Sequence, residues 1–299
     1  MAEFYTLLSE WPELVLDKPE MAVPTEVLRE QILSIDGLSR NELREIDLFF
    51  LAKDCKNLIA LLENNRTTLP YKGLWTKQEL QEMIADALED EFEDDPRFPS
   101  FMAQFVREYY ERKRQRGYFP EDRLMLRYWH YLEKEGSTFV KKWARLNIDI
   151  ANTLTAVLCK RQGWAVEEYT YEYDATEIDD TLQKQLKEIA KESDPVKKEQ
   201  RIDALKWVWI GDETFLESFS LNALYGYLLK TEMQERWTQL DPEQGQECFR
   251  QIIDNLRSES TVPAEFTTYM PKNESMAGPQ KATSSFNTKS EGNYNKKER

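Results

Sequence analysis

The sequence of 299 residues contains little of what catalytic and metal sites usually need. It has one histidine, ten glycines and three cysteines, and the cysteines (Cys55, Cys159 and Cys248) lie far apart without a C-x-x-C pair. These counts argue against a zinc or redox site, because such sites gather several Cys or His ligands. The sequence also lacks a G-x-x-x-x-G-K-[ST] loop and any recognisable Ser/His/Asp or Cys/His set. We therefore expect no catalytic residue, no cofactor, no metal ion and no small-molecule substrate.

The single histidine, His130, does not fit a di-iron centre either. Helical sites of that kind use Glu-x-x-His, and the residue three positions before His130 is Arg127. We expect His130 to be a surface or partly buried residue of a helix.

Long apolar runs and excess positive charge are also missing. No run approaches the roughly 18 uncharged apolar residues that a membrane span needs, and the mean hydropathy is −0.70. The first residues, Met-Ala-Glu-Phe-Tyr, do not have the pattern of a signal peptide. The net charge is −15, whereas a nucleic-acid partner requires clustered Lys and Arg. The sequence thus predicts a soluble, cytoplasmic protein with no membrane span and no nucleic-acid partner.

What the chain does contain is a succession of amphipathic stretches with helical spacing, which predicts an all-α fold. Thr76 and Glu79 form a capping-box pattern, and Pro120 stands where a first-turn proline is favoured. Glu232 and Arg236 are four residues apart and are expected to form an ion pair along their helix. The predicted helices cover residues 25–35 (with Thr25 as N-cap), 41–64, 76–90, 98–116, a stretch opened by Pro120, 138–162, 177–191, 195–209, 215–237 and 242–256.

Two segments are less regular. Residues 4–14 predict a brief extended or helical arm that inserts Phe4, Tyr5 and Trp11 into the core, and a peptide-binding role for these aromatics is the alternative. Residues 166–173 alternate loosely between polar and apolar types, which predicts a short strand or an extended linker.

One short pattern occurs twice, 95 residues apart. Asp54-x-x-Asn57 lies in the first long helix and Asp149-x-x-Asn152 in the second, and in each the two side chains share one helix face. At the edge of an apolar stripe, such a pair can bond to the backbone of a neighbouring helix or of the next element. We therefore interpret these four residues as structural ties between similar lobes. The alternative is a chance match between two ordinary amphipathic helices.

Acidic and polar segments flank the predicted core. The run 89–95 is either a cation site, a docking patch for a basic partner, or simply a solvated helix end, and its spacing does not match an EF-hand loop. Beyond residue 257 the sequence is rich in Ser, Thr, Asn, Lys, Pro and Gly. We expect a helical domain over residues 1–257 and a disordered polar tail over 258–299.

Several motifs together resemble a known family. They are Phe4-Tyr5-x-Leu7-Leu8-x-x-x-Pro12-x-Leu14, the two Asp-x-x-Asn helices, and Leu224-Tyr225-Gly226-Tyr227-Leu228-Leu229-Lys230-x-Glu232. The chain resembles an uncharacterised bacterial family whose genes accompany V-type ATPase operons, and it is similar to the C-type subunit of that ATPase (called d in eukaryotes). The resemblance covers most of the chain up to about Leu256. The acidic run 89–95 is a departure from it.

This resemblance implies an all-helical funnel of similar lobes that sits between the central stalk and the membrane rotor ring and performs no chemistry itself. The expected partners are the stalk and rotor subunits, and the expected location is cytoplasmic and peripheral to the membrane through the complex. A second hypothesis is a free-standing helical adaptor that binds a partner through its acidic patch or tail. A third is a hydrolase with scattered acidic residues.

Overall fold

The structure, a computed structural model, describes residues 2–16, 23–64, 68–89, 97–115, 117–170 and 178–239. All of them belong to one unit, Met1–Asp241. Within these ranges the regular elements are helices, which confirms the predicted all-α fold class. They are α1 (Ala2–Glu10), α2 (Thr25–Leu33), α3 (Arg40–Asn64), α4 (Lys77–Asp86), α5 (Ser100–Arg112), α6 (Pro120–Glu135), α7 (Thr138–Gln162), α8 (Val166–Tyr169), α9 (Asp180–Ile189), α10 (Pro195–Thr214), the 3₁₀ turn η2 (Phe215–Glu217) and α11 (Leu221–Gln239). The predicted helix 242–256 and tail 258–299 lie outside the described residues, as does nearly all of the acidic run 89–95.

Local capping signals set several helix ends where the sequence predicts them. At the start of α4, the Thr76 side chain accepts a hydrogen bond from the Glu79 N–H, and the Glu79 carboxylate accepts one from the Thr76 N–H. Pro120 occupies the first turn of α6, where its missing N–H costs no hydrogen bond. α7 ends at Gly163, whose φ of 71° is a left-handed conformation that glycine adopts without strain.

The start of α2 differs from the prediction. Thr25 is the first residue of the helix instead of its N-cap, and Pro24, which precedes it, makes no side-chain cap. The Thr25 N–H instead donates to the carboxylate of Glu235 on α11, at 2.6 Å. A residue from the far end of the described chain therefore satisfies the free backbone donor of α2.

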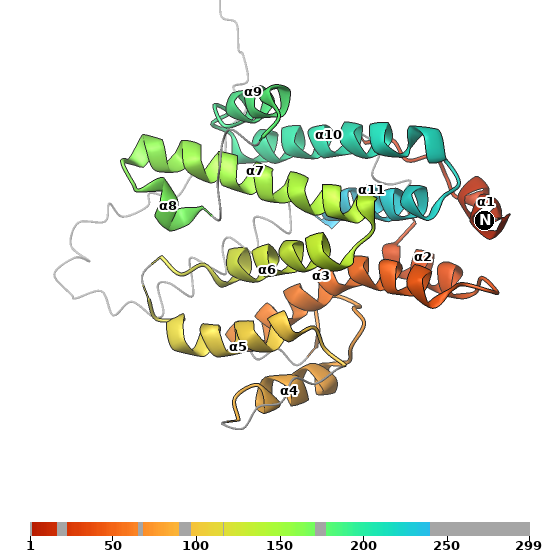
Figure 1. Cartoon of the computed structure of the whole chain (residues 1–299), viewed down its shortest axis with the longest axis horizontal. Coiled ribbons are helices and arrows are strands. Elements are labelled where there is room, and N and C mark those ends of the chain that lie inside the picture. The colour runs from red at the N-terminus through yellow and green to blue at the C-terminus, as the bar shows by residue number, and fades with distance from the viewer. Residues whose placement is uncertain are drawn as a thin grey trace, which may run out of the picture. The chain divides into compact units, whose positions relative to one another are not determined.

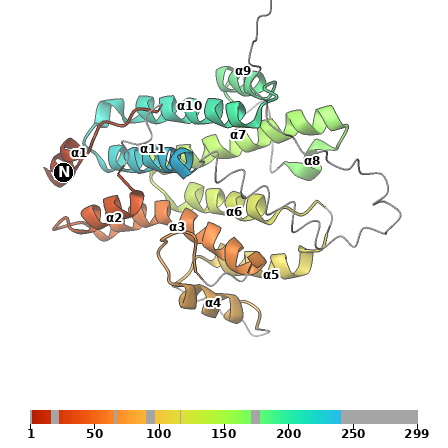
Figure 2. The same ribbon diagram turned by 180° about the vertical axis from the view of Figure 1, so that it is seen from behind.

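The helices pack side by side, with α6 between α3 and α7 and with α10 against α11 (Figures 1 and 2). α4 and α9 lie at opposite ends of this arrangement in both views. At its centre, the Tyr128 hydroxyl of α6 donates to the Leu48 carbonyl of α3 at 2.9 Å. The rings of Phe49 on α3 and Tyr225 on α11 meet edge to face, 5.9 Å apart. The core is thus shared by α3, α6 and α11.

α10 and α11 approach closely at Gly226. A Cβ atom at this position would lie 2.8 Å from Cγ2 of Ile210 and 3.3 Å from Cγ2 of Thr214, both on α10. Both neighbours are β-branched and stiff at χ1, so they cannot easily move aside. Glycine is therefore required by packing here and not by backbone conformation.

Of the two irregular segments, the N-terminal one takes the helical form of the predicted arm but differs at Tyr5, and the second differs from its prediction. Residues 2–10 form the helix α1, and although Phe4 and Trp11 are buried as predicted, Tyr5 is 55% exposed and does not insert into the core. Residues 166–169 form the single-turn helix α8 and not a strand or extended linker. Trp164 stacks on Tyr169 across this turn with ring centroids 5.3 Å apart, and this local contact favours the turn over extended chain.

Cys55 and Cys159 are buried within helices, and Cys248 lies outside the described residues. His130 is a partly buried residue of α6, with Nδ1 3.0 Å from Oε2 of Glu133. Glu232 and Arg236 do not follow their prediction, because each pairs with a residue of another helix, Lys56 and Asp203 respectively.

Candidate functional site

The first Asp-x-x-Asn pair binds the segment that leads into α4. Asn57 lies on α3 and is fully buried. Its amide group donates to the Tyr71 carbonyl at 2.9 Å and accepts from the Tyr71 N–H at 3.0 Å. The Asn57 amide therefore satisfies both the N–H and the C=O of Tyr71, as a backbone partner in regular secondary structure would.

Asp54 extends the same contact by one helical turn. Its carboxylate accepts from the Leu74 N–H at 2.7 Å and, more weakly, from the Trp75 N–H at 3.4 Å. A Cβ on Gly73 would lie 2.0 Å from the Asp54 Oδ1, so the segment approaches this closely only because residue 73 has no side chain. Burial raises the pKa of Asp54 to about 6, although the two backbone hydrogen bonds oppose the shift.

The second pair, Asp149 and Asn152, is also buried, on α7. Asp149 forms an ion pair with Arg145 of the same helix, at 3.1 Å. Asp54 and Asn57 thus bond to the segment that follows α3. The ion pair of Asp149, by contrast, lies within α7 itself. The role of all four residues as ties between lobes stays a prediction.

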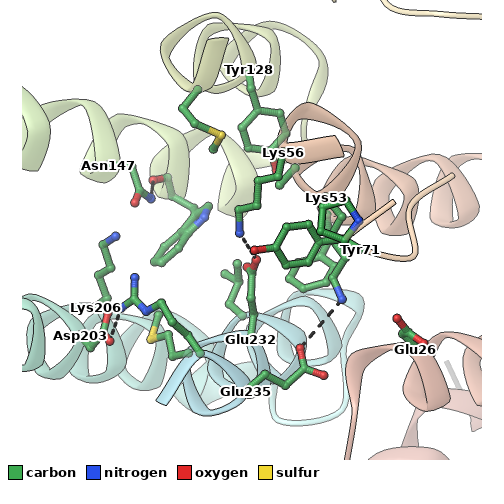
Figure 3. Close-up of a pocket in the computed structure, with 18 of the residues that line it drawn as sticks. Glu26, Lys53, Lys56, Tyr71, Tyr128, Asn147, Asp203, Lys206, Glu232 and Glu235 are labelled. Atoms are coloured by element: carbon green, nitrogen blue, oxygen red, sulfur yellow. Dashed lines mark hydrogen bonds and ion pairs between the residues drawn. The ribbon is translucent and has the colours of Figure 1, made fainter. Parts of the chain in front are cut away.

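A cavity of about 560 Å³ lies among α3, α6, α7, α10 and α11 (Figure 3). Its walls combine charged and aromatic side chains from helices that are far apart in the sequence. The lining residues used below are Lys53, Lys56, Met125, Tyr128, Trp129, Trp143, Asn147, Asp203, Lys206, Glu232, Glu235 and Arg236.

Three ion pairs join residues that line this cavity. Lys56 on α3 meets Glu232 on α11 at 2.9 Å, and Arg236 on α11 pairs with Asp203 on α10. Lys53 on α3 is buried, donates to the Thr25 hydroxyl and lies 3.9 Å from Glu235. These pairs hold α11 to α3, to α10 and to the start of α2.

The pKa values of Lys56 and Glu232 move as expected for a pair. The Glu232 carboxylate raises the pKa of Lys56. Burial alone would favour protonated Glu232, but the ammonium of Lys56 and its hydrogen bond keep the pKa of Glu232 below its ordinary value. Both groups are therefore charged at neutral pH.

An exposed apolar surface lies at the turn between α10 and α11. Phe215 is 76% exposed, Leu216 91% and Phe219 44%. Tyr5 of α1 packs on Phe219, with ring centroids 4.5 Å apart. In both views of the chain, α1 lies beside this turn (Figures 1 and 2). We call Tyr5, Phe215, Leu216 and Phe219 the turn patch.

Among the described residues, no group of three or more His, Cys, Asp or Glu side chains is arranged to hold a metal ion. None of the described helices is both long and apolar enough to cross a membrane.

The sequence predicted that Asp54 and Asn57 bond to the backbone of a neighbouring or following element, and both do so. It did not predict the cavity or the turn patch. The cavity's cations look like ordinary solvated charges in the sequence, because their partners lie far away along the chain. The adjacent pair Phe215-Leu216 is the available signal for the turn patch, but in the sequence it reads as part of an apolar helix.

A comparison with models of protein families finds a match that covers most of the chain. The model of a family described as "Protein of unknown function (DUF2764)" matches residues 1–185 and 182–260. No curated protein and no solved structure matches the chain.

Proposed function

The chain belongs to the family described as "Protein of unknown function (DUF2764)", and we propose that it is a non-catalytic coupling subunit of a V-type rotary ATPase, linking the central stalk to the membrane rotor ring. In this role it is peripheral to the membrane through the complex and works by holding its shape between two partners.

The turn patch is the observation that carries the proposal. Single exposed apolar residues are common on soluble proteins, but here the adjacent Phe215 and Leu216 are largely exposed, and Phe219 of the same turn packs on Tyr5. Apolar side chains gathered in this way mark a surface for another protein. A subunit that links a stalk to a rotor needs such a surface.

The motifs behind the resemblance also meet in space. Trp11, within the N-terminal motif, packs on Tyr227 of the α11 motif with ring centroids 4.6 Å apart. The Tyr227 hydroxyl donates to the Pro12 carbonyl at 2.9 Å. These two motifs therefore form one structural unit at the end of the molecule that carries the turn patch.

Rigidity is the second requirement of a coupling subunit, and the helices have contacts that supply it. The Asn57 and Asp54 bonds fix the segment before α4 on α3, and the Lys56–Glu232 and Arg236–Asp203 pairs fix α11 on α3 and α10. Each contact is directional, so sliding of one helix past another would break it.

Co-purification tests this proposal. The tagged chain, expressed in its native cells, is expected to recover V-type stalk and rotor subunits from gently solubilised membranes. A Phe215→Ser/Leu216→Ser variant should lose most of this recovery while keeping its helical circular dichroism.

Val196→Ser is the matched control. Val196 is also exposed, at 54%, but stands at the opposite end of α10, about 30 Å from the turn at 1.5 Å per residue. This control should co-purify like the unaltered protein. If the unaltered chain recovers no ATPase component, the proposal is wrong and the adaptor hypothesis takes its place.

A further inference from the structure

The cavity among α3, α6, α7, α10 and α11 is lined by four cations and four carboxylates, and one of the cations, Lys206, has no carboxylate in direct contact among the described residues. Lys53, Lys56 and Arg236 each have a carboxylate partner, Glu235, Glu232 and Asp203 respectively. The ammonium of Lys206 forms neither a hydrogen bond nor an ion pair within the part of the chain that the structure describes. The ring of Trp143 lies beside this ammonium, with its centroid 5.6 Å from Nζ.

The electrostatics of Lys206 agree with this geometry. Burial lowers the pKa of the Lys206 ammonium, and the carboxylates of Asp203, Glu199 and Glu232 offset this only in part. Asp203 is already engaged by Arg236 and by the indole N–H of Trp237, and Glu232 by Lys56. Arg236 adds a like charge nearby. A half-buried ammonium in such a place is stabilised by an anion that enters the cavity.

The walls beside Lys206 suit a flat organic molecule. Trp143 and Trp129 line the cavity with Met125 and Tyr128, and aromatic faces of this kind pack well against planar groups. Asn147 donates one amide N–H to the Trp143 carbonyl at 2.7 Å, and its amide group has a second N–H with which to donate to a carboxylate. Lys206 and Asn147 lie on the same side of the cavity (Figure 3).

From these features we propose that this cavity binds a small planar organic carboxylate, with the carboxylate on Lys206 and the ring against Trp143. The volume of about 560 Å³ is within the range of small-molecule sites. None of the turn-patch residues lines this cavity, so ligand binding can be tested on the purified chain alone, without the proposed ATPase partners.

Binding is measured with three probes that separate the contribution of the ring from that of the negative charge. Benzoate has both the ring and the carboxylate, benzamide keeps the ring without the charge, and inorganic phosphate has the charge without the ring. Calorimetric titration above pH 6, together with the shift of the melting temperature, is expected to show benzoate binding with a Kd on the order of a millimolar. Benzamide and phosphate should bind at least tenfold more weakly.

Lys206→Met removes the ammonium and keeps most of the side chain's bulk. This variant should weaken benzoate binding at least tenfold. Lys142→Met is the matched control, because Lys142 lies on α7 outside the cavity and pairs with Glu213 at 2.8 Å. It should bind benzoate as the unaltered protein does.

Three outcomes would overturn the proposal: no benzoate binding, benzoate and benzamide binding equally well, or benzoate affinity unchanged by Lys206→Met. Phosphate binding as tightly as benzoate would also contradict it, since the ring would then contribute nothing. If Lys206→Met fails to fold, the ranking of the three probes on the unaltered protein still decides the matter.

Discussion

Asp54→Ala tests whether the contact between α3 and residues 71–75 is a tie that stabilises the fold. Asp54 is fully buried, and its carboxylate is the acceptor for the Leu74 N–H at 2.7 Å. The alanine variant leaves this buried donor without its acceptor, which costs about 1–3 kcal/mol of unfolding free energy.

Part of this loss is offset at pH 7.5. Because burial raises the pKa of Asp54 to about 6, the folded protein ionises this group reluctantly, and its removal recovers some of that cost. We therefore expect a net destabilisation of about 1–2 kcal/mol, measured by urea unfolding monitored with circular dichroism. Asp47→Ala on the same helix should cost less than about 1 kcal/mol, because Asp47 is half exposed and pairs with Arg29 at 3.7 Å.

A double-mutant cycle with Gly73→Ala sharpens the test. In the unaltered protein the new Cβ would lie 2.0 Å from the Asp54 Oδ1, so this variant should lose about 1–3 kcal/mol. In the Asp54→Ala background the obstructing carboxylate is gone, and Gly73→Ala should cost at least about 1 kcal/mol less, on the order typical of contacting residues. Additive effects, within about 0.5 kcal/mol, would refute the reasoning.

Two further predictions concern pH and helix packing. The raised pKa of Asp54 means that the folded state binds a proton more tightly than the unfolded state, so stability falls as pH rises from the ordinary value of 3.8 to about 6 and is flat above that. Between pH 5.5 and 8 the unaltered protein should lose about 1 kcal/mol relative to Asp54→Asn, and parallel pH profiles of the two proteins would contradict this. Gly226→Ala should destabilise by about 1–3 kcal/mol, because its Cβ would lie 2.8 Å from the Ile210 methyl group. Gly211→Ala, whose Cβ would meet Lys230 Nζ at 3.9 Å, should instead stabilise by about 0.5–1 kcal/mol; melting curves that rank the two glycines the other way would show that packing does not decide these sites.

Helix positions were predictable from the sequence wherever local chemistry decides them. The bounds of α7 match the predicted 138–162 because Ser137 caps its start and Gly163 ends it. The α4 capping box and the Pro120 start of α6 are equally local. Residues 166–169 were mispredicted because alternation over a few residues cannot outweigh a ring contact that closes one helical turn.

Long-range contacts were not predictable in the same way. Glu232 and Arg236 fit the spacing of a pair along one helix, which is worth only a few tenths of a kcal/mol at a solvated surface. Partners on α3 and α10 are within reach only after the helices have packed, and nothing in the local sequence specifies Lys56 or Asp203 as those partners. The cavity depends on these same choices, so the sequence alone could not locate it. Asp54 was easier to recognise, because its acceptor role connects residues only about 20 positions apart.

The contacts of the N-terminal segment with α11 constrain the order in which the chain can fold. Gln234 donates to the Val15 carbonyl and Tyr227 to the Pro12 carbonyl, across 219 and 215 positions of sequence, and Thr25 reaches Glu235 across 210. During synthesis the N-terminal segment emerges first, yet its partners on α11 are made only after roughly 200 further residues. Closing so long a loop is entropically costly until the intervening helices have packed. The segment around Trp11 can therefore complete its packing only after α11 has been synthesised, and a nascent protein truncated before α11 would lack the Tyr227 ring that covers this indole.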